Sequence, residues 1–136
     1  MTPNPASDTF QAMSPSQFPP GEVLFRNEHT VLKQCRHGFF LFNSNDSFIG
    51  RSLDLYGEWC EAEGLLPLLG PGQVVVDVGA NIGTHTIPFA NKVTKTGLVV
   101  AFEPQRQVFN YLVSNLTLKN LLHVATFQSA LGEASG

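Results

Sequence analysis

The sequence is poor in charged residues, and positive charge is scarcest of all. Of 136 residues, 14% are charged, and 8 basic against 11 acidic side chains leave a formal net charge of −3. A chain of this sign offers little basic surface to a polyanion, which argues against binding to nucleic acid or to an anionic membrane. Hydrophobic residues make up 43% of the chain, enough for a buried core, so a wholly disordered protein is excluded.

Cysteine is also sparse, with Cys35 and Cys60 as the two examples. Two distant cysteines do not make a disulfide framework, and buried thiols in a reducing compartment are the expected alternative. The histidines and cysteines lack the spacing of a metal site, so we expect no metal. No apolar run approaches the ~20 residues of a membrane span, and the N-terminus lacks the features of a secretory signal. These absences favour a cytoplasmic protein without a membrane segment.

Three stretches of different composition follow one another. Residues 1–21 hold five of the nine prolines and a single charged side chain, Asp8, and we expect a disordered leader there. Residues 22–72 predict a small N-terminal unit of strands and one helix. Its expected elements are strands at 23–25, 29–36 and 39–42, a hairpin with its turn near His37-Gly38, and a helix over residues 58–70.

From residue 73 onward the pattern predicts alternating strands and helices. The expected strands are 74–76, 98–102 and 123–128, and the expected helices are 84–93 and one that Pro104 opens in its first turn. Because strands joined by helical crossovers lie parallel, this half predicts an α/β fold with a parallel sheet. The unbroken run Val74-Val75-Val76 is typical of a strand that is covered on both faces.

The turn after the first of these strands has the composition of a ligand-binding loop. It reads Asp77-Val78-Gly79-Ala80-Asn81-Ile82-Gly83. Glycine lets the backbone turn tightly and approach a ligand, and the free N–H groups of the following helix should point at the same place. Glu103 stands at the end of the next strand, where a carboxylate can accept the hydroxyl hydrogens of a ribose.

Two classes of cofactor use this layout, and the spacing favours one of them. A dinucleotide fingerprint, G-x-G-x-x-G, would place its glycines at Gly79, Asn81 and Thr84, so two of the three are missing. The carboxylate of Asp77 would also repel a diphosphate. S-adenosylmethionine carries an ammonium and a sulfonium and no phosphate, so an acid at that place suits it. A dinucleotide-dependent oxidoreductase and a non-catalytic binding remnant stay open as alternatives.

Two longer motifs resemble a known family. The runs D-V-G-A-N-I-G-T-H-T and A-F-E-P-Q-R resemble the FkbM-family methyltransferases, a branch of the class I S-adenosylmethionine-dependent enzymes. The upstream run N-D-S-F-I-G-R-S-L-D-L-Y-G-E-W is similar to one bacterial subgroup of that family, and the resemblance covers roughly residues 36–133. It implies a Rossmann-like fold, S-adenosylmethionine as cofactor, and methyl transfer to a hydroxyl of a sugar or small metabolite.

The resemblance also implies roles for particular residues. Those expected at the cofactor are Asp77, Gly79, Ala80, Asn81 and Gly83 at the methionine end, Glu103 at the ribose, and Ser129 and Ala130 beside the adenine. Structural alternatives stay open: Asp77 as a cap of the turn, Asn81 as a residue that tolerates positive φ, and Glu103 as an acid at a helix start. No catalytic base is predicted, because His85 fits a helix surface better.

The fold that the resemblance implies needs more chain than this sequence offers. Residues 73–136 have room for three strands and two helices of a seven-stranded domain. We therefore expect the N-terminal half of a methyltransferase, with an exposed edge on its first strand. By itself such a fragment should bind the cofactor poorly and be inactive. The sequence predicts neither the methyl acceptor nor the oligomeric state.

Overall fold

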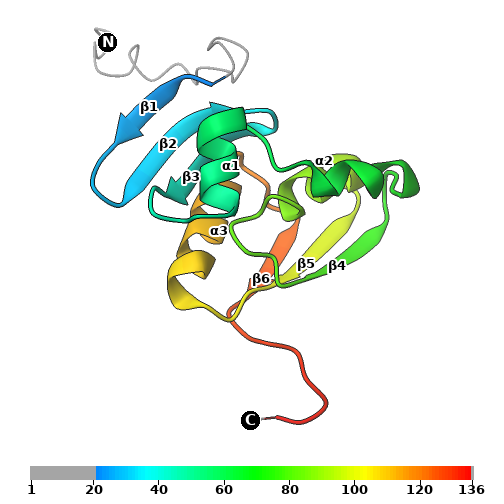
Figure 1. The fold of residues 1–136 in the computed structure, drawn as a ribbon. Helices are drawn as coiled ribbons and strands as arrows, with labels where there is room; N and C mark the ends of the chain where they lie inside the picture. The colour runs from blue at the N-terminus through cyan, green and yellow to red at the C-terminus, as the bar shows by residue number, and fades with distance from the viewer. Residues whose placement is uncertain (1–20, 136) are drawn as a thin grey trace, which may run out of the picture.

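A computed structural model describes residues 21–135, so the predicted leader, except for Gly21, lies outside the described residues. The N-terminal part is an antiparallel sheet in the order β1-β2-β3 (Figure 1). Its strands are β1 (Val23–Arg26), β2 (Thr30–Cys35) and β3 (Gly38–Asn43). Cys35 pairs with Gly38 across the β2–β3 turn, which confirms the predicted hairpin.

The helices of the N-terminal part differ from the prediction. Helix α1 (Ile49–Tyr56) lies where we expected strands and turns, and its start is held by Asp46, which accepts the N–H of Gly50 at 3.0 Å. The predicted helix over residues 58–70 is wrong, because that stretch forms two short 3-10 helices, η3 (Cys60–Gly64) and η4 (Leu66–Leu68). Gly64 and Pro67 explain the difference, since glycine and proline disfavour a continuous α-helix.

The second half has the predicted alternation of strands and helices. Its elements are β4 (Val74–Val78), α2 (Thr86–Val93), β5 (Leu98–Phe102), α3 (Arg106–Leu118) and β6 (Val124–Phe127). The three strands are parallel in the order β4-β5-β6. Pro104 does not sit in the first turn of α3 as predicted, because it precedes the N-cap residue Gln105. None of the helices within residues 21–135 is long and apolar enough to cross a membrane.

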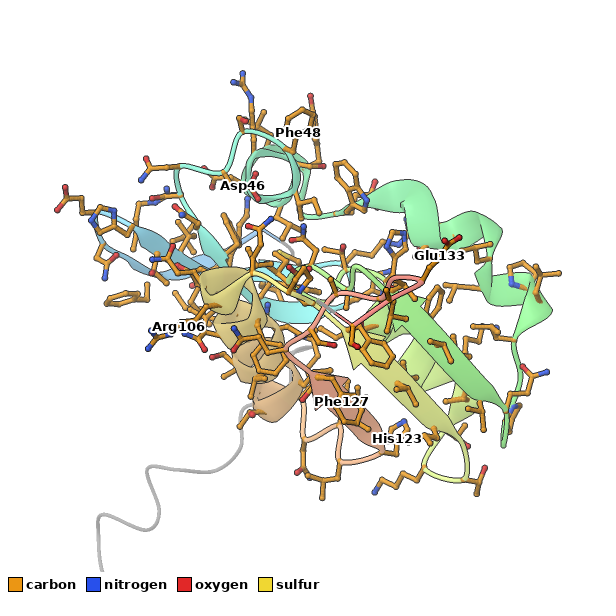
Figure 2. The ribbon with its side chains drawn as sticks, turned by 90° about the horizontal axis from the view of Figure 1, so that it is seen from below. Asp46, Phe48, Arg106, His123, Phe127 and Glu133 are labelled. Atoms are coloured by element: carbon orange, nitrogen blue, oxygen red, sulfur yellow. The ribbon has the colours of Figure 1, made fainter. Side chains whose placement is uncertain are left out.

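Helices α2 and α3 cover one face of the parallel sheet. Phe89 and Val93 of α2 pack against Val99, and Leu112 of α3 joins a second cluster with Ala101. That second cluster also contains Phe42 of β3, so α3 lies between the two sheets (Figure 2). The N-terminal sheet is thus joined to the parallel sheet through a shared hydrophobic core.

The other face of the parallel sheet is open within residues 21–135. Val74, Val76 and Val78 of β4 are 57–67% exposed, and Phe127 of β6 is 50% exposed. The expectation that the β4 run is covered on both faces is therefore wrong for the described part of the chain. No strand within residues 21–135 pairs with the outer edge of β4, as predicted for the first strand.

Candidate functional site

The predicted site residues lie where the three strands of the parallel sheet have their carboxyl ends. Asp77 lies near the end of β4, Glu103 follows β5 directly, and Ser129 follows β6 by two residues. Because the strands are parallel, their carboxyl ends lie side by side. The loop after β4 bends over the end of β5, since the N–H groups of Gly79 and Ala80 both donate to the carbonyl of Phe102 at 2.9 Å.

Glu103 ties this loop to the start of α3. It is 4% exposed, and its Oε2 accepts the N–H of Asn81 at 2.9 Å while its Oε1 accepts the N–H of Gln105 at 3.0 Å. The carboxylate is thus oriented by two backbone donors from different elements. Glu103 precedes α3 and is not an acid of its first turn, although it accepts the N–H of the N-cap residue Gln105. Each of its oxygens retains a lone pair for a ligand hydroxyl.

The carboxylate of Asp77 bonds to α2 and not to the turn that follows β4. It is 8% exposed, and its Oδ2 accepts the hydroxyl of Thr86, in the first turn of α2, at 2.6 Å. This bond holds the start of α2 against the end of β4. Asp77 and Glu103 therefore place two nearly buried carboxylates at the same sheet edge.

The backbone N–H groups of the loop are already used within the chain. Besides those of Gly79, Ala80 and Asn81, the N–H of Ile82 donates to Asn81 Oδ1 at 2.9 Å, and the N–H of Gly83 donates to the carbonyl of Ala80 at 3.0 Å. The N–H groups of residues 79–83 are thus unavailable to a ligand, whereas the expected free N–H groups at the start of α2 stay a prediction. A loop without free donors lacks the groups that grip a diphosphate at a dinucleotide site.

The glycines of the loop serve two different purposes. Gly79 has φ +74° and open space where a Cβ would stand, so its backbone is accessible from outside. A Cβ on Gly83, which has φ +99°, would lie 3.2 Å from Leu112 and 3.3 Å from Ile87, so this glycine allows close packing. Ala80 is buried as well, whereas Asn81 is half-buried with φ 52°. Gly79 and Asn81 thus face the outside more than Ala80 and Gly83 do.

Ser129 and Ala130 lie in the segment that leaves the sheet after β6 (Figure 1). Both are exposed, and the N–H of Ser129 donates to the carbonyl of Phe127 at 2.9 Å. The rings of Phe102 and Phe127 stack with their centroids 5.3 Å apart, which joins the ends of β5 and β6. The adenine role of Ser129 and Ala130 stays a prediction.

Two polar residues near the loop escaped the sequence analysis. Asn115 of α3 is fully buried, and its Nδ2 donates to the carbonyl of Ile82 at 2.9 Å. Its position on the apolar stripe of a helix was the available signal, since a buried amide needs partners. Thr84 Oγ1 is buried without a hydrogen-bond partner within residues 21–135 and follows the loop directly. Within the same residues, no group of three or more histidine, cysteine or acidic side chains is placed to hold a metal ion.

The fold of this chain is similar to that of several solved structures. No protein-family model matches the chain, and no curated protein matches it by sequence. The structure of P. horikoshii TYW2 in complex with MeSAdo has a TM-score of 0.62 at 20% identity, over 85% of this chain and 41% of that one. M. jannaschii TYW2 in complex with AdoMet has a TM-score of 0.60 at 25% identity, over 79% of this chain and 47% of that one.

A third similar structure is a SAM-dependent O-methyltransferase from Thermotoga maritima, with a TM-score of 0.50 at 20% identity, over 83% of this chain and 42% of that one. The chain spans less than half the length of each of these three structures. The α/β architecture is that of the Rossmann-like, class I methyltransferases, over three parallel strands and the two helices between them.

Proposed function

We propose that this chain is part of an S-adenosylmethionine-dependent methyltransferase of the FkbM family, which methylates a hydroxyl of a sugar or small metabolite. The family and the hydroxyl acceptor rest on the two motifs around Asp77 and Glu103. The net charge of −3 supports a small acceptor over nucleic acid, and we propose a cytoplasmic location without a membrane partner.

One observation carries the choice of cofactor. The N–H groups of residues 79–83 are all bonded within the chain, and the two carboxylates of Asp77 and Glu103 lie at the same sheet edge. Such a site offers negative charge and no free loop donors. It suits the cationic methionine end of S-adenosylmethionine and disfavours the diphosphate of a dinucleotide. The neighbour crystallised with AdoMet, at 25% identity, supports the same choice.

The residues of the chain have distinct parts in this proposal. Glu103 accepts the ribose hydroxyls with the lone pairs that the N–H groups of Asn81 and Gln105 leave free. Gly79 gives the cofactor access to the backbone, and Asp77 faces the ammonium directly or through water. The cofactor, when bound, supplies the methyl group on its sulfonium, and the chain contributes orientation. Ser129 and Ala130 border the adenine.

Cofactor binding separates the proposal from its alternatives. Saturation-transfer NMR on the 136-residue chain should detect S-adenosylhomocysteine and not NAD. Because Gly79, Ser129 and Ala130 are exposed, the described residues enclose little of a ligand, and we expect a dissociation constant of about 1 mM, or roughly −4 kcal/mol. Binding of NAD alone would favour the oxidoreductase, and binding of neither would favour the non-catalytic remnant.

The acceptor needs a second measurement. Release of S-adenosylhomocysteine from S-adenosylmethionine should be compared in the presence of free monosaccharides and of RNA. Turnover with RNA and not with saccharides would contradict the small hydroxyl acceptor while leaving the cofactor in place.

A further inference from the structure

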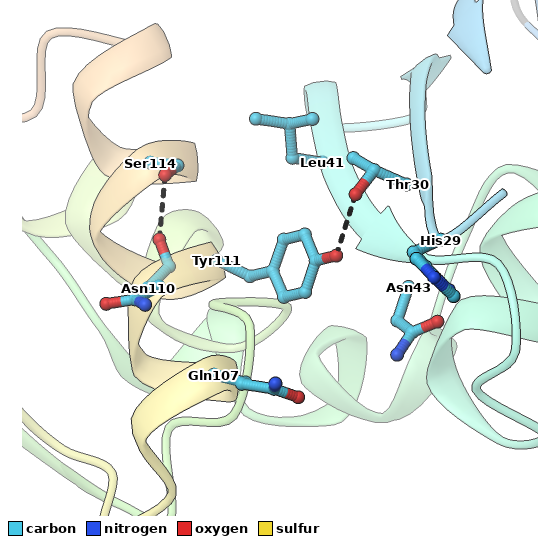
Figure 3. Close-up of a pocket in the computed structure, with 8 residues that line it drawn as sticks. All are labelled: His29, Thr30, Leu41, Asn43, Gln107, Asn110, Tyr111 and Ser114. Carbon is cyan, nitrogen blue, oxygen red and sulfur yellow. Dashed lines mark hydrogen bonds between the residues drawn. The ribbon is translucent and has the colours of Figure 1, made fainter. Parts of the chain in front are cut away.

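A pocket lies between the N-terminal sheet and α3, and none of its lining residues belongs to the loop after β4. It is a partly open pocket with a volume of about 570 Å³, within the ~300–1,000 Å³ of small-molecule sites. Figure 3 shows its walls, which come from the start of β2, the end of β3 and one side of α3. The lining residues are His29, Thr30, Leu41, Asn43, Gln107, Asn110, Tyr111 and Ser114.

The lining combines polar groups with apolar surface and carries no lysine, arginine, aspartate or glutamate. Apart from His29, whose Nε2 lies 3.8 Å from the carboxylate of Glu28, the lining offers no group of opposite charge to a phosphate, a carboxylate or an ammonium, so a charged ligand would be desolvated with little compensation. The amides of Gln107 and Asn110 each offer donors and an acceptor, and that of Asn43 offers its donors, since its Oδ1 accepts the N–H of Asn45 at 2.8 Å. A hydroxyl group is likewise a donor and an acceptor, so this set matches a neutral ligand rich in hydroxyls.

Part of the pocket is held in place and part is free to bind. The hydroxyls of Thr30 and Tyr111 share a hydrogen bond of 3.0 Å across the gap between β2 and α3, which fixes the Tyr111 ring in the wall (Figure 3). The hydroxyl of Ser114 donates to the carbonyl of Asn110 at 2.7 Å. In contrast, the side-chain amides of Gln107 and Asn110 have no hydrogen-bond partner in the described part of the chain, and one helical turn brings both to the same side of α3.

The backbone beside the pocket argues against an extended peptide as the ligand. Strand β3 is an edge strand, and such an edge can pair with an added strand. Here, however, the N–H and the carbonyl of Leu41 both bond to the amide of Asn115, at 2.6 and 3.0 Å, and the carbonyl of Phe39 accepts from Lys119. Because these backbone groups already have hydrogen-bond partners, we expect the pocket to bind its ligand through side chains.

We propose that this pocket binds a neutral saccharide at a site separate from that of the cofactor. The ring of Tyr111 provides an apolar wall for the C–H face of a sugar ring, and the amides of Gln107 and Asn110 exchange hydrogen bonds with its hydroxyls. The assignment goes beyond the proposed function, because it places saccharide binding at Gln107 and Asn110, in a pocket that contains no residue of the loop after β4. The double variant Gln107→Ala/Asn110→Ala distinguishes this pocket from an acceptor site elsewhere.

Saturation-transfer NMR on the full 136-residue chain tests the proposal with the methyl glycosides of glucose, galactose and rhamnose as probes. At least one should bind, and the double variant Gln107→Ala/Asn110→Ala should weaken its binding about fivefold or more. Asn91→Ala, an exposed change on α2, is the matched control and should leave binding unchanged. Tyr111→Phe, which removes the bond to Thr30, should weaken binding as well.

Three results would overturn the assignment: no signal from any of the glycosides, equal binding by the double variant and the parent chain, or stronger binding of glucose 6-phosphate. Both Gln107 and Asn110 are exposed, so loss of fold is not expected, and a circular dichroism melt verifies this. S-adenosylhomocysteine measured in the same samples separates the two proposals. Binding of a glycoside without binding of S-adenosylhomocysteine would contradict the proposed function alone. Binding of S-adenosylhomocysteine without binding of any glycoside would contradict the saccharide pocket alone.

Discussion

The side-chain amide of Asn115 joins α3 to the loop after β4, because its Nδ2 lies 2.9 Å from the carbonyl oxygen of Ile82. The same amide exchanges two hydrogen bonds with the backbone of Leu41 in β3. A single buried side chain therefore links the N-terminal sheet, the helix and the candidate cofactor loop. The N-terminal sheet thus helps to hold the loop that the proposed function depends on.

Replacing Asn115 by leucine should strongly destabilise the chain. Asn115→Leu removes the partner of three backbone groups, which are the buried carbonyl of Ile82 and the half-buried N–H and carbonyl of Leu41, and a buried group without a partner costs about 1–3 kcal/mol. We expect the free energy of unfolding in urea to fall by about 3 kcal/mol or more. Asn110→Leu makes the same change at an exposed position of α3 and should cost about 0.5 kcal/mol or less. Similar losses in both variants would contradict the role of Asn115.

Glu103→Gln should weaken the binding of S-adenosylhomocysteine. The amide of glutamine retains one acceptor but turns an NH2 group toward one of the two backbone donors, so the side chain loses its orientation and its charge. We expect a rise in the dissociation constant of about tenfold, or ~1.4 kcal/mol, in an NMR titration. Glu28→Gln, at an exposed loop between β1 and β2, is the control. An unchanged constant for Glu103→Gln would remove Glu103 from the cofactor site.

Lys119 should make stability rise with pH just above neutrality. Burial lowers the pKa of Lys119 from 10.5 to about 8, and its ammonium stands 4.2 Å from the centre of the Phe40 ring. Between these two pKa values the unfolded chain binds a proton that the folded chain has released, so the free energy of unfolding increases with pH there. Burial also raises the pKa of Cys35 from 9.0 to about 11, which lowers stability with pH above 9.

Together, Lys119 and Cys35 predict that the free energy of unfolding rises from about pH 7.5 to 9 and changes less with pH above 9. Urea unfolding at several pH values measures the profile. Lys119→Met should abolish the rise below pH 9, whereas Lys92→Met, at an exposed position of α2, should preserve it. A profile that is flat in the parent chain would show that Lys119 keeps its ordinary pKa.

The open face of the parallel sheet should make the 136-residue chain associate. Val74, Val76 and Val78 present a row of exposed β-branched side chains beside an unpaired strand edge, and such surfaces pair with other chains. Sedimentation velocity should show association that grows with protein concentration. Val76→Lys should reduce it, and Val113→Lys, which adds the same charge on α3, should not. A monomer at all concentrations would contradict the prediction.

Several elements could be predicted from the sequence because their signals are local. The apolar runs of β4, β5 and β6, and the helical period between them, identify a parallel α/β unit without reference to distant residues. The hairpin, whose turn lies at Arg36 and His37, is similarly local. Helix α1 and the two 3-10 helices were predicted wrongly, because Asp46 begins α1 through a side-chain bond and Pro67 with Gly64 interrupts the stretch that follows.

The sequence by itself determined the composition of the candidate site, since Asp77, Gly79 and Glu103 are recognisable by their type and spacing. Only the tertiary structure decided how these groups are used. The N–H groups of the loop bond within the chain, and Asn115 reaches Leu41, 74 residues away in sequence. Hydrogen bonds between distant segments depend on how helices and strands pack, and residue type and spacing do not encode that packing locally. The saccharide pocket exists for the same reason, since its walls meet only after β2, β3 and α3 have packed together.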